Sequence, residues 1–339
     1  MKQDNYSTNI LDSLKDINLI CSDHLDHMKD IASRIPDAIP NQFAVETLMS
    51  KEQYQARIYF ETIHKEAPPD FLTCHPDEHG LCGSLPEILD YFYREWSIQD
   101  SFLDRLLGSV GYRMNYDNKS DYIVNDFFFK FSSISELTEY EENPFDTLSF
   151  VKEIYHLIVQ KELPHLNSQT LKDFFVTLYA HKGSFIKMKL IDLCIQKKPR
   201  FFFTLQNWDD IFEVLSTIQW PGDYQMLRNF DSKLSSLFNK WIFEIEITDS
   251  VQPYLGIKGM FPKENELSTK LESVISTSLE SDFLSDGDRR IFDKKAQSLL
   301  DDRFLMKNIK DKIEYMKFDM SEEFETRIRL LFDIPDNCR

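Results

Sequence analysis

Residues Ile242-Phe-Glu-Ile-Glu-Ile-Thr248 stand apart in this chain, because apolar and polar side chains alternate there with a period of two. Such alternation is typical of a β-strand whose two faces meet different surroundings. Immediately afterwards, residues 251–265 hold two Gly and two Pro, which interrupt regular structure. We therefore predict one small β element near 242–261 and a domain boundary beside it.

On both sides of this stretch, apolar residues recur every three or four positions, which is the spacing of amphipathic helices. The clearest start is at Ser84, where Glu87 completes a capping box and Pro86 occupies the first turn. The predicted helices cover residues 9–35, 50–67, 85–98, 99–107, 121–138, 147–161, 169–181, 184–197, 209–219 and 224–241, and most of 268–335.

The predicted fold class is all-α, with stacked antiparallel helical hairpins that form a solenoid or an irregular bundle. Only 9 Gly are present, which disfavours turn-rich β folds. Residues 171–178 also resemble residues 208–215 at an offset of 37, a period found in two-helix repeats. We expect an N-terminal helical unit with a Cys/His-rich loop (1–84), a helical-hairpin core (85–250), a linker (251–267) and a C-terminal helical unit (268–339).

Charge and motifs exclude several functions. The chain has 39 Lys and Arg against 57 Asp and Glu, a net charge of −18 that disfavours overall binding to nucleic acid. Dinucleotide, P-loop, nucleophile-elbow, zincin and EF-hand motifs are absent from the sequence. No signal peptide or apolar run long enough for a membrane span is seen, and five cysteines suggest reduced thiols, so we predict a cytoplasmic protein.

Reactive side chains concentrate between residues 74 and 82. Cys82 lies two residues before the predicted helix cap at Ser84, where the helix dipole favours a thiolate. His75 or His79 would be the base. This arrangement indicates a cysteine-dependent hydrolase or transferase.

The segment Gly80-Leu-Cys-Gly-Ser84, followed by a helix, resembles the helix start of papain-like cysteine proteases, whose signature has the form G-x-C-G-S-C-W. In that alignment the family's nucleophile falls on Leu85, Pro86 replaces the aromatic residue, and Cys82 matches the family's structural cysteine. A looser resemblance, over residues 80–107, is to virulence-type papain-like proteases that begin with G-x-C and a helix. That family requires a later His on a strand, and the predicted strand at 242–248 carries none.

The same loop supports two other interpretations. Thiolates and imidazoles are the usual zinc ligands, so a structural zinc ion would be held by Cys74, His75, His79 and Cys82. Alternatively, the loop is an ordinary polar connection and Cys82 an inert thiol. No other cofactor is indicated.

A basic stretch precedes Phe201-Phe-Phe203 and indicates a patch for phosphate or lipid. The alternative is that these cations end a helix and the Phe residues seal a core. The patch consists of Lys182, Lys187, Lys189, Lys197, Lys198 and Arg200.

The favoured function is an acidic helical protein–protein interaction module, such as an adaptor, an effector or an immunity protein. Its partner would be another protein, of basic charge if it docks on the acidic residues 131–146. The sequence leaves the oligomeric state open.

Overall fold

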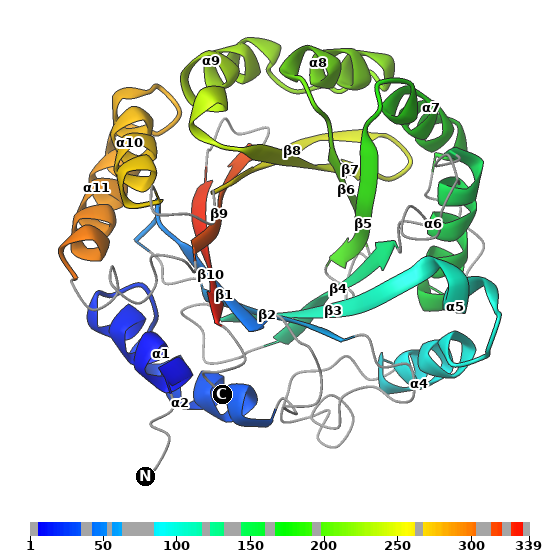
Figure 1. The fold of residues 1–339 in the computed structure, drawn as a ribbon, viewed down its shortest axis with the longest axis horizontal. Helices are drawn as coiled ribbons and strands as arrows, with labels where there is room; N and C mark the ends of the chain where they lie inside the picture. Colours follow the sequence, from blue (N-terminus) through cyan, green and yellow to red (C-terminus); the bar gives the residue numbers. More distant parts are fainter. Residues whose placement is uncertain are drawn as a thin grey trace.

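The strands form one closed barrel. The computed structural model describes residues 6–34, 43–52, 56–62, 85–116, 123–131, 144–159, 167–191, 198–261, 267–302, 313–320 and 327–334. Within them, ten antiparallel strands close in the order β1-β10-β9-β8-β7-β6-β5-β4-β3-β2. Helices surround the barrel on its outside (Figure 1). Closure leaves no free sheet edge.

The strands are joined as hairpins. They are β1 (Phe43–Leu48), β2 (Ala56–Thr62), β3 (Leu107–Tyr116), β4 (Ile123–Phe131), β5 (Ser184–Ile191), β6 (Lys198–Thr204), β7 (Lys240–Ile247), β8 (Val251–Met260), β9 (Ile313–Met320) and β10 (Arg327–Ile334). The helices are α1 (Tyr6–Asp16), α2 (Ser22–Arg34), α4 (Leu85–Trp96), α5 (Phe102–Leu106), α6 (Pro144–Val159), α7 (Ser168–Ala180), α8 (Trp208–Thr217), α9 (Tyr224–Leu234), α10 (Leu267–Glu280) and α11 (Asp286–Asp301), with a short 3₁₀ helix at Ser235–Leu237.

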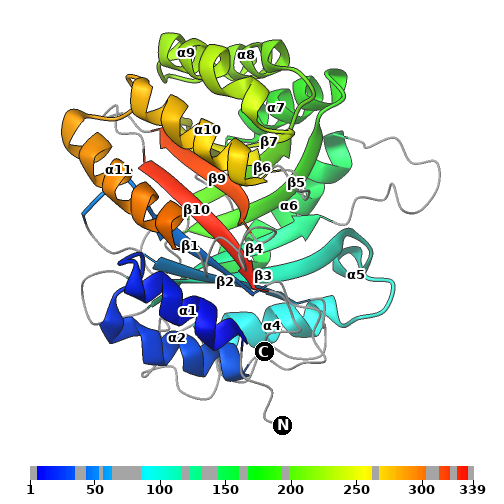
Figure 2. The same ribbon diagram turned by 60° about the vertical axis from the view of Figure 1, so that its left-hand side comes forward.

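The described elements repeat as two helices followed by two strands, five times along the chain. Figure 2 shows the helices lying against the outer face of the barrel. The hairpins start at residues 43, 107, 184, 240 and 313, so the repeats differ in length and give no fixed sequence period. The 37-residue offset relates α7 to α8, which belong to successive units on either side of the β5–β6 hairpin. It is not the period of a two-helix solenoid.

Several helix starts are fixed by local capping, which satisfies otherwise unpaired N–H groups. The carboxylate of Asp223 accepts hydrogen bonds from the N–H groups of Gln225 and Met226 at the start of α9. The side chains of Asn167 and Ser285 cap α7 and α11 in the same way. These caps fix the residue at which each helix begins.

The apolar core lies between the barrel and the helices, and outward-facing strand residues build it. On β6, the rings of Phe201 and Phe203 pack against Phe174 of α7, with centroids 6.5 Å and 5.1 Å apart. Both β6 residues are fully buried. Burying such a side chain contributes about 1.5–3 kcal/mol, so the helical layer and the sheet stabilise each other.

The inward-facing residues are of a different kind, because they are mostly charged or aromatic. On β2, for example, Arg57, Tyr59 and Glu61 line the barrel cavity, whereas Ile58 lies in the outer core. Successive side chains of a strand point to opposite faces, so each strand separates an apolar outer face from a polar inner one. A ten-stranded barrel is wide enough to leave space between these inner side chains.

The all-α prediction is wrong. The β element predicted near 242–261 exists as β7 and β8, but it is one hairpin of a ten-stranded barrel. Helices predicted over 85–98, 147–161, 169–181 and 209–219 correspond to α4, α6, α7 and α8. The segments 50–67, 121–138, 184–197 and 304–331 instead contain β2, β4, β5, and β9 with β10. Bulky residues on both faces of these strands, as in Phe127-Phe-Phe129, hide the period of two.

The predicted domain boundaries at 84, 250 and 267 all fall between strands of this one barrel. The proposed N-terminal unit contains β1 and β2, and the proposed linker contains β8. Since β1 pairs with β10, the first and last units share a ladder. Within the described residues, no helix has both the length and the apolar character that crossing a bilayer demands.

Candidate functional site in the barrel lumen

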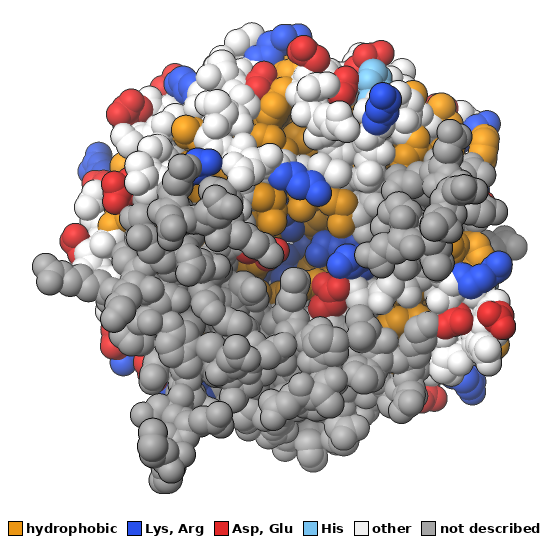
Figure 3. Space-filling view, in the orientation of Figure 1, with side chains coloured by type: hydrophobic (Ala, Val, Ile, Leu, Met, Phe, Trp, Pro, Cys, Tyr) orange, Lys and Arg blue, Asp and Glu red, His pale blue; other side chains and the backbone are white. Residues whose placement is uncertain are grey.

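A cavity of about 230 Å³ lies inside the barrel. Figure 3 shows the hollow at the centre of the ring, with basic and hydrophobic side chains at its edge. Among the described residues, its charged lining consists of the seven basic residues Arg57, Arg113, Lys130, Lys187, Lys189, Lys258 and Lys317 and the four acidic residues Glu46, Glu61, Glu244 and Glu314. The lumen therefore has an excess of positive charge, although the chain as a whole carries −18.

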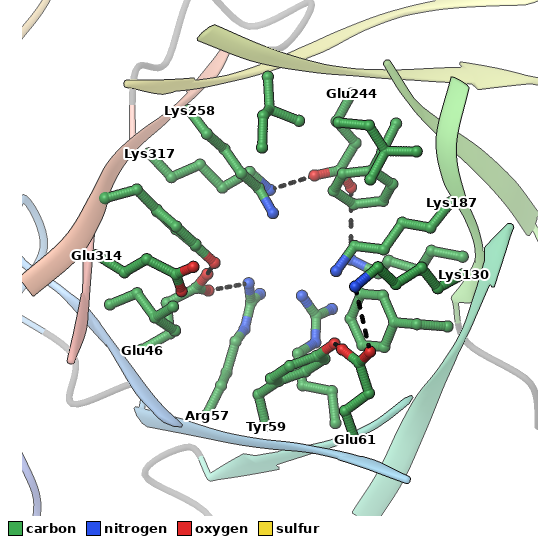
Figure 4. Close-up of a pocket in the computed structure, with 18 of the residues that line it drawn as sticks. Glu46, Arg57, Tyr59, Glu61, Lys130, Lys187, Glu244, Lys258, Glu314 and Lys317 are labelled. Atoms are coloured by element: carbon green, nitrogen blue, oxygen red, sulfur yellow. Dashed lines mark hydrogen bonds and ion pairs between the residues drawn. The ribbon is translucent and has the colours of Figure 1, made fainter. Parts of the chain in front are cut away.

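Strand register brings these charges together from distant parts of the sequence. In the β5–β6 ladder, Lys187 lies opposite Phe202, and Lys189 lies opposite Arg200. Lys317 of β9 lies opposite Lys258 of β8. Alternation along each strand turns all of these side chains inward. Figure 4 shows Lys187, Lys258 and Lys317 pointing into the lumen from different strands of the barrel.

The carboxylate of Glu244 is the centre of one ionic cluster. Its Oε2 lies 2.7 Å from the Nζ of Lys317, and its Oε1 lies 3.4 Å from both the Nζ of Lys189 and the Nη1 of Arg200. Glu244 is fully buried. Burial opposes its ionisation, but Lys189, Lys317 and Arg200 hold the pKa of Glu244 well below its usual range.

A second layer of ion pairs forms the floor of the cavity. Asp319 and Glu246 lie one inward-facing position beyond Lys317 and Glu244 on their strands, and neither lines the cavity. Asp319 accepts from Arg329 at 3.2 Å and from the hydroxyl of Tyr254 at 2.5 Å. Glu246 accepts from the Nε of Arg200 at 2.9 Å. These groups neutralise one another below the open space.

Lys187 and Lys258 differ from the other lumen cations. Within the described part of the chain, no carboxylate oxygen lies within 4.0 Å of either ammonium group. Both Nζ atoms lie near the ring of Phe202, at 5.3 Å for Lys187 and 4.4 Å for Lys258. Burial, together with the nearby ammonium groups of Lys187 and Lys317, lowers the pKa of Lys258 to about 7. Two lysines at a cavity wall without a carboxylate partner suit an anion, which would favour their charged forms.

Two further carboxylates of the lining, Glu46 and Glu61, are held by hydrogen bonds. Glu46 accepts from the Nη1 of Arg57 at 2.8 Å and from the hydroxyl of Tyr315 at 3.1 Å. Burial opposes ionisation of Glu46, but Arg57 and neighbouring cations hold the pKa of Glu46 well below its usual range. Glu61 accepts from the hydroxyls of Tyr59, at 2.5 Å, and Ser109. Both carboxylates are ionised.

Aromatic and aliphatic surfaces complete the lining, which includes Tyr59, Phe128, Phe202, Tyr315, Ile186, Ile242, Met260 and Leu331. The ring of Phe128 lies 4.7 Å from the Nζ of Lys187, so aromatic faces and ammonium groups adjoin. A cavity with both surfaces suits a ligand that joins an anionic head to an apolar body. Aromatic faces also stabilise a positive charge placed above them.

The structure divides the predicted basic patch. Lys187 and Lys189 line the cavity, and Arg200 pairs with Glu244 and Glu246. Lys198 lies 3.6 Å from Glu246 at the strand end, whereas Lys182 is exposed in a turn with φ 53°. Lys197 lies outside the described residues. Whether the patch holds phosphate stays a prediction, because no bound ligand tests it.

Cys74, His75, His79 and Cys82 all lie outside the described residues, as does most of the acidic segment 131–146. Across the portion that is described, no group of three or more His, Cys, Asp or Glu side chains is arranged to hold a metal ion. The zinc site therefore stays a prediction.

Most of the lumen residues, such as Arg57, Glu61 and Lys258, were not predicted from the sequence as site residues. Their signal is a charged residue or a tyrosine at every second position, as in Lys187-Met-Lys189 or Tyr315-Met-Lys317-Phe-Asp319. Each run is only a few residues long, and the intervening apolar residues also fit a helical stripe. The period of two becomes clear only once the strands are aligned.

Comparisons with known proteins identify the fold. No family model matches the chain, and no curated protein matches it in sequence. AnaPT from Neosartorya fischeri is similar in structure, with a TM-score of 0.59 at 10% identity, covering 98% of this chain and 93% of that one. A 6-dimethylallyl tryptophan synthase gives 0.57 at 11% identity, covering 97% and 95%. Prenyltransferase PriB, in its binary complex with product diphosphate, gives 0.58 at 11% identity, again covering 97% and 95%.

The shared barrel corrects the functional predictions. The interaction module rested on an all-α fold with extended surfaces, and this chain has instead an enclosed, charged lumen in a fold shared with a synthase and a prenyltransferase. These neighbours also leave the cysteine-dependent hydrolase or transferase without support. The comparison shows the fold, and the enclosed lumen replaces the extended helical surface on which the adaptor prediction rested.

Proposed function

We propose that this protein is a prenyltransferase, which binds an allylic prenyl diphosphate in the lumen and transfers the prenyl group to an aromatic acceptor. The main support is the pair Lys187 and Lys258, two lysines at the cavity wall with no carboxylate oxygen within 4.0 Å of either Nζ in the described residues. A diphosphate would supply the missing negative charge. The likeness to a dimethylallyl tryptophan synthase and to PriB with product diphosphate points to the same substrate class.

The two surfaces of the cavity fit the two parts of such a donor. The diphosphate faces the lysines, and the prenyl chain lies along Phe128, Phe202 and the aliphatic lining. The C1–O bond breaks with both electrons passing to the diphosphate, whose growing charge the lysines stabilise. The allylic cation that remains is shielded from water by aromatic rings, whose faces attract positive charge.

The acceptor ring then forms the new bond. A ring carbon attacks the allylic cation, which gives a protonated ring, and that ring loses its proton to a base of the lumen. The protonated ring is a strong acid, so a weak base suffices. The ionised carboxylates of Glu46 and Glu61 line the same space and suit this role. The products are a prenylated aromatic compound and diphosphate.

The test is direct. Purified protein is incubated with dimethylallyl diphosphate or a longer prenyl diphosphate and a panel of aromatic acceptors that includes tryptophan, and products are followed by mass spectrometry. We expect an acceptor that gains one prenyl group, with release of diphosphate. The double variant K187M/K258M should lose at least about 100-fold in kcat/KM, as expected when two buried charge contacts are removed.

The matched control is K172M, because Lys172 is an exposed lysine on α7. Its rate should equal that of the unmodified protein. Absence of any prenylated product with every donor and acceptor, in protein that is folded, would overturn the proposal.

A further inference from the structure

We infer that Glu244 is a built-in counter-anion, which competes with the ligand's diphosphate for the lumen cations and so limits its affinity. This inference rests on the proposed function for the identity of the anion. Glu244 lies on the cavity wall, and its two oxygens already engage Lys189, Arg200 and Lys317 at 2.7–3.4 Å.

The position of Glu244 makes it a competitor rather than part of the floor. Lys189 and Lys317 line the cavity together with Glu244, so a bound anion would approach the same two ammonium groups. Glu246 also pairs with Arg200, but it lies one layer deeper and does not line the cavity. Glu244 and Glu246 thus lie two residues apart on one strand. Glu246 forms an ion pair of the floor, and Glu244 forms one that faces the ligand.

The local backbone is adapted to this cluster. Gly256 lies directly opposite Glu244 in the β7–β8 ladder and opposite Asp319 in the β8–β9 ladder. A Cβ atom there would lie 3.0 Å from the Cβ of Glu244, 3.0 Å from the Cε of Lys317 and 2.8 Å from the hydroxyl oxygen of Tyr254. The missing side chain lets Lys317 reach across β8 to Glu244.

The consequence is electrostatic. In a buried site, a fixed negative charge beside an anion costs far more than it would in water. Diphosphate must therefore share the cations with Glu244 and be repelled by it. After transfer, the same repulsion favours release of product diphosphate, because Glu244 restores the ion pairs as the anion leaves.

The experiment titrates inorganic pyrophosphate into the full-length protein by calorimetry at low salt and about pH 6, where a lysine of pKa about 7 is protonated. We expect E244Q to bind pyrophosphate at least about tenfold more tightly than the unmodified protein. The matched control E246Q should change affinity by less than about threefold. E244D, which keeps the charge, should stay close to the unmodified protein.

A gain in affinity is diagnostic, because damage to the site would weaken binding. Unchanged or weaker binding by folded E244Q overturns the inference. If E244Q alone does not fold, the comparison is made between K317M and K317M/E244Q, and the double variant should bind more tightly than K317M. Equal or weaker binding by that double variant overturns the inference as well.

The two proposals fail separately. Pyrophosphate binding needs neither a prenyl chain nor an acceptor. Tighter binding by E244Q in a protein that forms no prenylated product would overturn the transfer reaction but keep the counter-anion. Prenyl transfer by a protein whose E244Q variant binds pyrophosphate no more tightly would keep the transfer reaction but overturn the counter-anion. If neither protein binds pyrophosphate, the counter-anion inference is wrong, and the transfer reaction is decided by its own product assay.

Discussion

Lys317 and Glu244 form a 2.7 Å ion pair between strands β9 and β7, although β8 lies between these strands in the barrel. Their side chains are 2% and 0% exposed. The same ammonium group contacts Asp319 at 2.7 Å and donates to the hydroxyl of Tyr254 at 2.9 Å. Lys317 therefore joins the ionic floor to the cavity wall.

We expect K317M to lower the free energy of unfolding by about 3–5 kcal/mol, because it leaves Glu244 and Asp319 buried without their nearest cation. Urea denaturation at neutral pH measures the change. The control is K15A, which removes an ion pair between two exposed side chains and should cost less than about 1 kcal/mol. A K317M protein as stable as the unmodified one would show that the pair contributes nothing.

Replacing Lys258 should have the opposite effect on stability. The pKa of its ammonium group falls from 10.5 to about 7 on folding. Between pH 7 and pH 10.5 the unfolded chain binds one proton more than the folded protein, so Lys258 makes the free energy of unfolding rise with pH. The destabilisation caused by burying its charge is fully present below pH 7. K258M should be about 2–4 kcal/mol more stable than the unmodified protein near pH 6. The gain should shrink towards pH 9–10, and a gain independent of pH would contradict this account.

Binding of the anion should be accompanied by proton uptake. Near pH 8, Lys258 is mostly neutral in the free protein, and a bound diphosphate raises its pKa by favouring the charged form. Calorimetric titrations with pyrophosphate in two buffers of different ionisation enthalpy measure the protons taken up. We expect up to about one proton per site near pH 8 and much less near pH 6. Proton release at pH 8 would contradict the prediction.

Two adjacent Phe residues allow the lumen and the outer core to be tested separately. The ring of Phe202 adjoins Lys187 and Lys258, so F202L should lower kcat for prenyl transfer by about 3–30-fold, as loss of a cation–π contact predicts. Phe203 packs outward against Phe174 and Phe243. F203L should lower thermal stability and leave kcat unchanged. A loss of kcat in F203L, with no loss in F202L, would contradict the placement of Phe202 in the lumen and Phe203 in the outer core.

Part of the fold was predictable from local patterns. The helical stripes of α6, α7 and α8 are complete within each segment, because a helix makes its hydrogen bonds inside its own residues. The alternation in Ile242–Thr248 likewise marked β7 without other information. The sequence instead predicts helices over β2, β4, β5, β9 and β10 and no regular element over β1, β3 and β6. Short apolar runs fit both periods, and a strand's partners lie elsewhere in the chain.

The candidate site could not be read in the same way. The basic stretch, for which the sequence predicts a phosphate or lipid patch, contains Lys187, Lys189 and Arg200, which lie in or beside the lumen. Whether they bind an anion stays a prediction. Lys258, Lys317 and Glu244 come from other hairpins and have no local motif. Their contacts exist only because strand register aligns them across the barrel.

The sequence by itself therefore determined several helices, such as α6, α7 and α8, the strand at Ile242–Thr248 and the acidic character of the whole chain. Only the tertiary structure decided that the strands close into a barrel and that an acidic protein has an excess of cations at its centre. The physical reason is that closure separates the two faces of every strand. Apolar side chains such as Phe203 pack under the helices, and charged ones such as Lys258 meet inside, far from their neighbours in the chain.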